Sequence, residues 1–228
     1  MTNELTHTRW SEIWDKGLAP GELFDANSIT PLLGSLINEG KVPIGRALVP
    51  GCGRGYDVTA LATKDRYVLG LDIAENAIKA ASERRDALSE EECTFKANAD
   101  FQTTSFFDLD GSIIENKFDF IYDYTFLCAL DPSVRPQWAQ KMAELVKPQG
   151  ELLTLIFPIR EPDDKGPPFQ VSMELYRELL EPVGFTCELL EPLPPELCHK
   201  GRRGDEAVDV KGNVKIMGTS AVGRWRRV

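Results

Sequence analysis

The sequence predicts an α/β fold: a doubly wound, Rossmann-like sheet of seven strands, mostly parallel, with helices on both faces and an antiparallel last strand. Apolar runs of strand length alternate with helical patterns along the chain. A glycine-rich turn joins the first run to a helix, and the second run ends in a carboxylate, as is typical of a nucleotide-binding sheet. The length of 228 residues suits one domain, so we expect residues 1–228 to fold as a single unit.

The charge balance narrows the class of partner. The chain carries a formal net charge of −10 and has a pI near 4.8, whereas binding to nucleic acid or anionic lipid would require a basic face. We therefore expect a small-molecule substrate, no nucleic acid and no membrane among its partners. We also expect a monomer or a weak dimer.

Cysteine and histidine usage argues against a disulfide framework and against a metal site. The five cysteines lack Cys-x-x-Cys spacing, and the two histidines form no ligand-spaced cluster. The amino terminus has no apolar core of signal-peptide length, and no stretch approaches the ~20 apolar residues of a membrane span. These features predict reduced thiols, no metal and a cytoplasmic protein.

Residues 1–40 are predicted to form a helical segment ahead of the first strand. Trp10 and Trp14 are four residues apart, so they share one face of a short helix. The pair either packs that helix onto the core or belongs to a lid over a bound ligand. Phe24 is a further lid candidate, and a second helix is expected over 27–37.

The functional interpretation depends on a glycine-rich turn that follows the first predicted strand (46–49). Gly51, Gly53 and Gly55 alternate through this turn. Glycines let the backbone turn sharply and contact a ligand, so Gly51 and Gly53 are predicted to bind a nucleotide. Tyr56 stands where a dinucleotide site would have its third glycine, and no Gly-Lys-Ser/Thr follows. An ordinary glycine turn is the alternative.

A helix predicted over 57–62 and a second strand over 67–71 lead to Asp72, about 20 positions beyond Gly51. A carboxylate at this spacing accepts hydrogen bonds from the two ribose hydroxyls. No phosphate-binding group accompanies it, and a helix over 74–87 follows directly, so S-adenosylmethionine is a better match than NAD. The sulfonium cation would be attracted to the aromatic faces of a lid.

The third strand is predicted over either 93–98 or 103–106, and the pattern leaves both open. In a doubly wound sheet the residues just past this strand reach the adenine. Ser105 and Phe106 are therefore candidates to meet the exocyclic nitrogen and to stack on the base. Phe106 could equally be a core residue.

The fourth strand is predicted over 118–124, where apolar and polar residues alternate. Asp123 and Tyr124 end this strand, at the edge of the sheet where such folds bind ligands. Together they could hold the amino group of the methionine part and shape an acceptor pocket. Asp123 could instead cap a turn.

The remainder of the chain is predicted to hold two further helices and three strands. The helices are expected over 135–146 and 172–180, and the strands over 151–156, 187–190 and 214–220. The stiff segment from Gly166 to Phe169 could form a wall over the site or an ordinary surface loop. Residues 193–212 form a long polar excursion, locally basic around His199, which either contributes to binding or is a solvated mobile loop.

Together these motifs resemble the plant-type halide/thiol methyltransferases and the thiopurine S-methyltransferases. The resemblance rests on Trp10-x-x-x-Trp14, Val49 to Val58, Gly70-Leu71-Asp72-Ile73, Phe118 to Tyr124, the turn from Leu145 to Leu152, and Gly166-Pro167-Pro168-Phe169. It implies a class I methyltransferase with S-adenosylmethionine as cofactor. It further implies cofactor contacts from Trp10, Trp14, Gly51, Asp72, Ser105, Phe106 and Tyr124. Two departures flank the expected acceptor pocket: Phe24 stands where plant members have a third tryptophan, and 193–212 has no clear plant counterpart.

The resulting prediction is methyl transfer to a small thiol, or to a halide, by in-line displacement. A thiol is a few per cent ionised at neutral pH, so a strong general base is optional. The candidate helpers are Asp123, Tyr124, Arg160 and His199. Two alternatives stay open: a small-molecule O-methyltransferase of secondary metabolism, and a catalytically silent methyltransferase-like protein that binds the cofactor.

Overall fold

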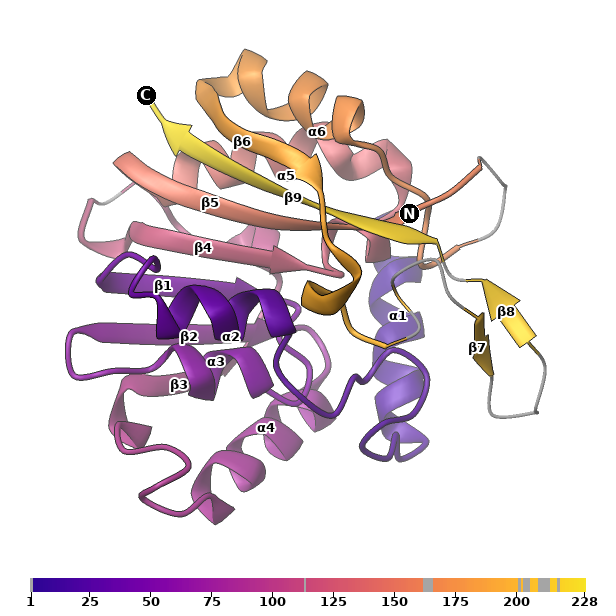
Figure 1. Cartoon of the computed structure of the whole chain (residues 1–228). Coiled ribbons are helices and arrows are strands. Elements are labelled where there is room, and N and C mark those ends of the chain that lie inside the picture. Colours follow the sequence, from indigo (N-terminus) through magenta and orange to yellow (C-terminus); the bar gives the residue numbers. More distant parts are fainter. Residues whose placement is uncertain are drawn as a thin grey trace.

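The computed structural model describes residues 2–112, 114–161, 166–200, 202, 206–208, 214–216 and 218–228. At its centre is a seven-stranded sheet in the order β3-β2-β1-β4-β5-β9-β6 (Figure 1). Its strands are β1 (Gly45–Pro50), β2 (Arg66–Asp72), β3 (Ala99–Thr103), β4 (Phe118–Tyr124), β5 (Val146–Ile159), β6 (Phe185–Pro192) and β9 (Thr219–Arg227). A separate hairpin pairs β7 (Glu206–Val208) with β8 (Val214–Ile216).

The pairing pattern is that of a doubly wound sheet. β1 pairs in parallel with both β2 and β4, and parallel pairing continues from β2 to β3 and from β4 to β5. β9 runs antiparallel to both of its neighbours, β5 and β6. The predicted sheet, including its antiparallel last strand, is therefore confirmed. The strand order reverses between β1 and β4, and open α/β sheets bind ligands at such a switch point.

Helices cover both faces of the sheet, with α2, α3 and α4 on one face and α5 and α6 on the other (Figure 1). The helices are α1 (Thr2–Asp15), α2 (Pro31–Asn38), α3 (Tyr56–Leu61), α4 (Glu75–Ala87), α5 (Arg135–Leu145) and α6 (Met173–Leu180). Short 3-10 helices span Lys96–Asn98, Phe106–Asp108, Ile114–Asn116, Leu127–Ala129, Pro132–Val134, Glu181–Val183 and Pro195–Leu197. None of the helices in the described part of the chain has the length and apolar character needed to cross a membrane.

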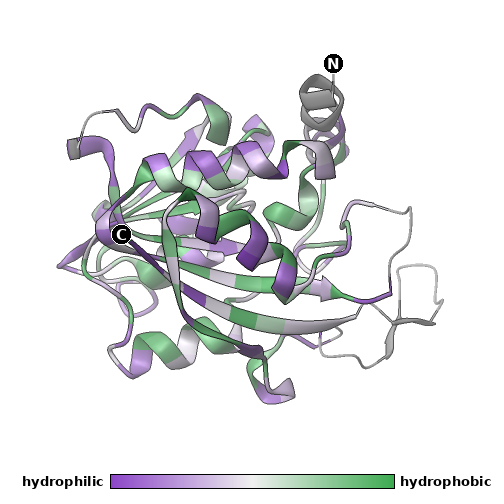
Figure 2. Cartoon of the chain, turned by 90° about the horizontal axis from the view of Figure 1, so that it is seen from above, coloured by the Kyte–Doolittle hydropathy of each residue, from purple (hydrophilic) through white to green (hydrophobic). Residues whose placement is uncertain are grey.

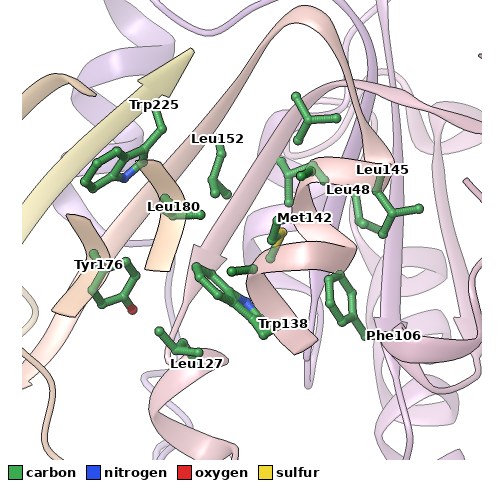
Figure 3. Packing of buried hydrophobic residues seen from close by; sticks show 14 of the residues in the cluster. Leu48, Phe106, Leu127, Trp138, Met142, Leu145, Leu152, Tyr176, Leu180 and Trp225 are labelled. Atoms are coloured by element: carbon green, nitrogen blue, oxygen red, sulfur yellow. The ribbon is translucent and has the colours of Figure 1, made fainter. Parts of the chain in front are cut away.

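Two buried clusters join the sheet to its helices. On the side of α5 and α6, Trp138 and Trp225 are fully buried and pack with Met142 and Tyr176 (Figure 3). A second cluster lies between the sheet and α2 and α3, and includes Tyr122. Apolar residues concentrate along the strands, and hydrophilic residues recur on the outer helix surfaces (Figure 2). Because apolar side chains fill the space between the sheet and its helices, the candidate functional groups lie at the ends of the strands.

The third strand differs from both predicted ranges. β3 covers Ala99–Thr103, between the predicted 93–98 and 103–106, and only the buried Ala99 and the partly buried Phe101 pack inward. An edge strand with a mostly exposed pattern leaves little apolar signal, which explains the error.

The last strand was also predicted too early. Residues 214–216 belong to the β7–β8 hairpin, and the sheet strand is β9 (Thr219–Arg227). β9 contains several charged residues, so the pattern of apolar residues did not identify it as a strand. Glu151 on β5 explains their presence, because its almost fully buried carboxylate pairs with Arg224 at 2.8 Å and with Arg226 at 3.4 Å.

The start of α2 is set by capping and not by the apolar pattern. The helix was predicted over 27–37, but it begins at Pro31 because the Thr30 side chain accepts a hydrogen bond from the Leu33 amide at 3.1 Å. Proline at the first helical position needs no amide partner, so the boundary is sharp.

Candidate functional site

The predicted site residues gather at the edge where the parallel strands end. Figure 1 shows α1 beside this edge, and the β7–β8 hairpin projects from the same end of the molecule. The glycine-rich turn follows β1 here, and Asp72 and Tyr124 end β2 and β4. The topology therefore brings together residues that lie far apart in the sequence.

In the glycine-rich turn, residues with side chains would be strained or would clash with neighbouring rings. Gly51 and Gly53 have φ angles of 62° and 51°, in the left-handed region that favours glycine. A Cβ at Gly51 would lie 2.7 Å from the Phe126 ring, and one at Gly53 would lie 3.5 Å from the Trp14 ring. The turn thus presents bare backbone between two aromatic side chains.

Asp72 is fixed next to this turn by backbone donors. One carboxylate oxygen accepts from the Gly53 amide and the other from the Ala74 amide, each at 3.0 Å. Burial raises the pKa of Asp72, although these amide bonds act in the opposite direction. Its side chain remains partly exposed, and each oxygen keeps a further lone pair. This arrangement suits a carboxylate that accepts hydrogen bonds from ribose hydroxyls.

The aromatic residues of the amino-terminal segment form one cluster next to the turn. Phe24 contacts both indoles edge to face, with ring centroids 5.1 Å from Trp10 and 6.2 Å from Trp14. Trp14 is buried against Ala74 and Ala77 at the start of α4. Trp14 therefore packs α1 against the start of α4, and its ring also lies beside the glycine turn.

Arg54 links the turn to the amino-terminal segment, a role that the sequence patterns did not reveal. Its guanidinium bonds the Asp25 carboxylate at 2.8 Å and the Leu18 carbonyl at 2.6 Å, and it lies 5.3 Å from the Trp14 ring centroid. Both side chains of the ion pair are largely buried. Arg54 occupies a variable position of the glycine motif, so the motif gives no indication of its contact with Asp25.

Ser105 and Phe106 lie at the start of a 3-10 turn beyond β3. The Ser105 hydroxyl accepts from the Phe107 amide at 3.3 Å and caps the turn. Phe106 is buried, with 4% of its surface exposed, and packs against Phe126 at 5.2 Å. Phe106 therefore belongs to the core beneath the glycine turn, the alternative that the sequence left open.

Asp123 and Tyr124 point to opposite sides of the sheet, because successive strand residues alternate. Asp123 is fully buried, and its oxygens accept from the Trp138 indole at 2.9 Å and the Leu127 amide at 3.3 Å. Burial raises its pKa to about 6. The expectation that Asp123 and Tyr124 line one pocket is therefore corrected. Asp123 lies on the face of the sheet that α5 covers, where it holds the segment that follows β4.

Tyr124 forms a hydrogen-bonded network with two residues of the long loop. Its hydroxyl lies 3.0 Å from His199 Nδ1 and accepts a hydrogen bond from Arg202. His199 Nε2 lies 2.9 Å from the Ile29 carbonyl, which can only accept, so Nε2 carries the proton and Nδ1 accepts from Tyr124. Arg202 also donates to the Phe24 carbonyl at 2.7 Å. His199 and Arg202 of the predicted loop thus pack against Tyr124, whereas residues 201, 203–205 and 209–212 of that loop lie outside the described residues.

Burial and the nearby Arg202 guanidinium lower the pKa of His199 to about 4. Burial also raises the pKa of Tyr124 to about 12, even though Arg202 opposes this shift. Both groups are therefore neutral at pH 7. His199 can orient Tyr124 but is a poor proton acceptor in this state.

Arg160 lies in a different part of the edge from this network. Its guanidinium donates to the Pro168 carbonyl at 3.1 Å, next to the predicted wall. That wall is held from two further sides: the Phe169 amide donates to the Cys128 carbonyl at 2.7 Å, and Arg9 of α1 donates to the Gly166 carbonyl at 3.3 Å. Arg160 therefore positions the wall segment.

Asp57 is a polar group that the sequence interpretation missed. It follows Tyr56 in α3, and the Thr30 backbone is near enough to lower the pKa of its carboxyl group. Its Oδ1 atom is buried and makes no hydrogen bond within the described part of the chain. Burial raises the pKa of Asp57 to about 7, while the Arg202 and Arg84 guanidinia oppose this shift. A buried oxygen without a donor is a site at which a cation or donor could bind.

A cavity of about 210 Å³ lies away from this edge. It is lined in part by Leu109, Asn116 and Leu145, and by Arg46, whose guanidinium lies 5.0 Å from the Tyr67 ring centroid. It contains none of the predicted site residues, so we do not assign the predicted ligand to it.

Comparisons with known proteins agree with this geometry. Residues 5–209 match the family model described as thiopurine S-methyltransferase. The chain is 39% identical over 227 residues to probable thiol methyltransferase 2 of Arabidopsis thaliana, covering 100% of this chain and 88% of that protein. It is 37% identical over 219 residues to thiocyanate methyltransferase 1 of Brassica oleracea, covering 96% and 84%. The structure of an N-methyltransferase from Bradyrhizobium japonicum in complex with S-adenosylhomocysteine shares the fold, with a TM-score of 0.64, 15% identity, and coverage of 95% and 97%.

Proposed function

Because this chain belongs to the thiopurine S-methyltransferase family and is an S-adenosylmethionine-dependent methyltransferase, we propose that it methylates the sulfur of a small thiol. The names of the relatives, a probable thiol methyltransferase and a thiocyanate methyltransferase, support a soft nucleophile as acceptor. The observation that carries the proposal is the Asp72 carboxylate held against the bare backbone of Gly53.

The residues at this edge suit the cofactor. Asp72 is the proposed ribose ligand, and the backbone of Gly51 and Gly53 would lie along the nucleoside. Ser105 is the proposed adenine contact, with Phe106 supporting it from the core. The proposed contacts at the sulfonium end are Trp10, Trp14, Phe24 and Tyr124.

Residues 1–40 act as a lid in this proposal. The edge-to-face contacts of Phe24 with Trp10 and Trp14 place aromatic rings next to the glycine turn, where they would attract a cation and exclude water. Arg54 holds the segment in this position through Asp25. The lid and the sheet would then form one domain.

Bound S-adenosylmethionine would supply a methyl group on a positively charged sulfur, which is already activated toward a soft nucleophile. The chain's own contribution is orientation, for which intramolecular reactions set a scale of about 7–11 kcal/mol. Tyr124 is held in one orientation by His199 and Arg202, and Arg160 holds the opposing wall. Asp123 has a positioning role, because both of its oxygens are already bonded within the protein.

The acceptor pocket is proposed to lie between Tyr124 and the wall that ends at Phe169. The cytoplasm is the proposed compartment, and the free thiols of Cys52, Cys93, Cys128 and Cys187 suit a reducing environment. A monomer or weak dimer is the proposed state.

The test is a panel of acceptors with isotope-labelled S-adenosylmethionine. Thiols and thiocyanate should be methylated, and the other product should be S-adenosylhomocysteine. Turnover of catechols or phenols without turnover of thiols, thiocyanate or iodide would instead favour the O-methyltransferase alternative. Cofactor binding without turnover of any acceptor would favour the catalytically silent alternative.

A further inference from the structure

We propose that Asp57 and Arg202 bind the two charged groups of the cofactor's amino acid, Asp57 the ammonium and Arg202 the carboxylate. The inference rests on the proposed function and extends it to the part of the ligand that Asp72 does not reach. Neither side chain was among the predicted site residues. Both belong to the same corner of the sheet, between the glycine turn and Tyr124.

Asp57 offers a buried acceptor with no donor. Its Oδ1 atom is buried and makes no hydrogen bond within the described part of the chain. Leaving a buried carboxylate oxygen unsatisfied costs free energy, so such an atom calls for an explanation. An ammonium group has three donors and a positive charge, and would satisfy this oxygen.

Arg202 offers donors and the opposite charge. Its guanidinium bonds the Tyr124 hydroxyl and the Phe24 carbonyl, and it lies 5.1 Å from the Tyr124 ring centroid and 5.3 Å from the Phe157 ring centroid. A guanidinium has five N–H donors, so these two bonds leave others for a carboxylate. The contacts with two rings and with the lid segment fix its orientation.

The three charged side chains come from neighbouring elements at the strand ends. A nucleoside whose ribose is held at Asp72 would pass along the glycine turn, and its chain would end where α3 begins and β4 ends. Asp57 lies two residues after Gly55, and Tyr124, which bonds Arg202, ends β4. A zwitterion needs a negative and a positive partner close together, and Arg202 is near enough to Asp57 to oppose the rise in its pKa.

A pH dependence of binding follows from this arrangement. Burial raises the pKa of Asp57 to about 7, and a bound ammonium would favour the ionised form and lower it. Affinity for an amine-bearing ligand should therefore be highest above pH 7 and fall as the pH drops below it. Among the groups that face Asp57, Arg202 and Arg84 carry guanidinium groups, and burial raises the pKa values of Tyr122 and Cys52 well above their usual values and that of Tyr124 to about 12.

The test compares two nucleosides by isothermal titration calorimetry. S-adenosylhomocysteine carries the amino acid, whereas 5′-methylthioadenosine has the same base, ribose and sulfur without it. Asp57→Asn and Arg202→Gln should each weaken binding of S-adenosylhomocysteine by on the order of 10- to 150-fold and leave 5′-methylthioadenosine unchanged. Matched controls are Asp65→Asn and Arg177→Gln, which alter exposed side chains elsewhere.

Several outcomes would overturn the inference. Equal losses for the two nucleosides would show that Asp57 only supports the Thr30 segment. If the wild-type protein binds both nucleosides equally well, the amino acid contributes nothing to binding, and the inferred site for it does not exist. A wild-type protein that binds neither would overturn the proposed function itself. If Asp57→Asn fails to fold, the Arg202→Gln variant and the wild-type pH dependence decide, since S-adenosylhomocysteine should lose more affinity below pH 7 than 5′-methylthioadenosine does. Equal losses of affinity would count against the inference.

Discussion

Asp72 illustrates how one side chain can be both fixed and available. Two backbone amides hold its oxygens, and its partial exposure leaves lone pairs for a ligand. Such pre-organisation lowers the entropic cost of binding, because the carboxylate need not be ordered again. The same amides also connect β2 to the glycine turn and to the start of α4.

Asp72→Ala should weaken cofactor binding, since it removes a charge-assisted contact to the ribose. We expect a loss of about 1.5–3 kcal/mol in binding free energy, measured by calorimetry with S-adenosylhomocysteine. Asp65→Ala, an exposed aspartate, serves as the control. An unchanged dissociation constant for the Asp72 variant would remove this residue from the proposed site.

His199 should make folding stability depend on pH. Its pKa is lowered from 6.5 to about 4 in the folded protein, so the unfolded chain binds a proton more readily between these values. The resulting stabilisation is present above pH 6.5 and is lost as the pH falls toward 4, by up to roughly 3 kcal/mol. The raised pKa values of Asp57 and Asp123 act in the opposite direction.

The difference between wild type and His199→Gln isolates this effect from the two aspartates. Urea unfolding at pH 7 and at pH 4 should show that the advantage of wild type shrinks as the pH falls. A difference that stays constant with pH would mean that His199 is not held neutral in the folded state.

At the scale of elements, the amino-terminal segment is attached by specific polar contacts and by the packing of Trp14 on Ala74 and Ala77. Arg54 binds Asp25 and the Leu18 carbonyl, and Asn76 of α4 donates to Asp15 at the end of α1, at 2.8 Å. In the proposed function, these contacts hold the lid beside the glycine turn.

Arg54→Gln should loosen the lid without unfolding the sheet. The change leaves Asp25 with a buried, unpaired carboxylate, and breaking a buried pair typically costs about 3–5 kcal/mol. Limited proteolysis should cut the segment before α2 faster, and the KM for S-adenosylmethionine should rise. The Arg54→Gln/Asp25→Asn double variant should recover part of the loss; if it does not, the ion pair is not the relevant contact.

At the scale of the whole molecule, contacts join segments from both ends of the chain. Arg9 of α1 reaches the Gly166 carbonyl, and Arg202 bonds the Phe24 carbonyl near the other terminus of the sequence. β9, close to the carboxyl end, lies between β5 and β6 and completes the sheet. Such contacts favour cooperative unfolding of the lid and the sheet together.

Scanning calorimetry should therefore show one unfolding transition, and the cofactor product should shift it. At a hundred times its dissociation constant, S-adenosylhomocysteine adds about 2.7 kcal/mol of stability, which corresponds to roughly 5–11 °C for a domain of this size. Two separate transitions, of which only one responds to the ligand, would contradict a single domain.

The sequence by itself determined the layered α/β architecture. Continuous apolar runs identified β1 and β2, because central strands are buried on both faces, and the alternation of apolar and polar residues identified β4. The glycine spacing and Asp72 are local in sequence, so the proposed nucleoside contacts could be named from the sequence alone. The motif resemblance supplied the methyltransferase family, which the comparisons confirmed.

The tertiary structure decided the features that depend on contacts between distant segments. β3 and β9 have weak apolar patterns, and their places follow from neighbours such as Glu151, which pairs with Arg224. The roles of Asp57, Arg54 and Arg202 were likewise invisible, because their partners lie about 25 to 180 positions away and no local pattern records such pairing. Local spacing encodes backbone geometry, whereas burial and charge pairing arise only when the folded chain brings these side chains together.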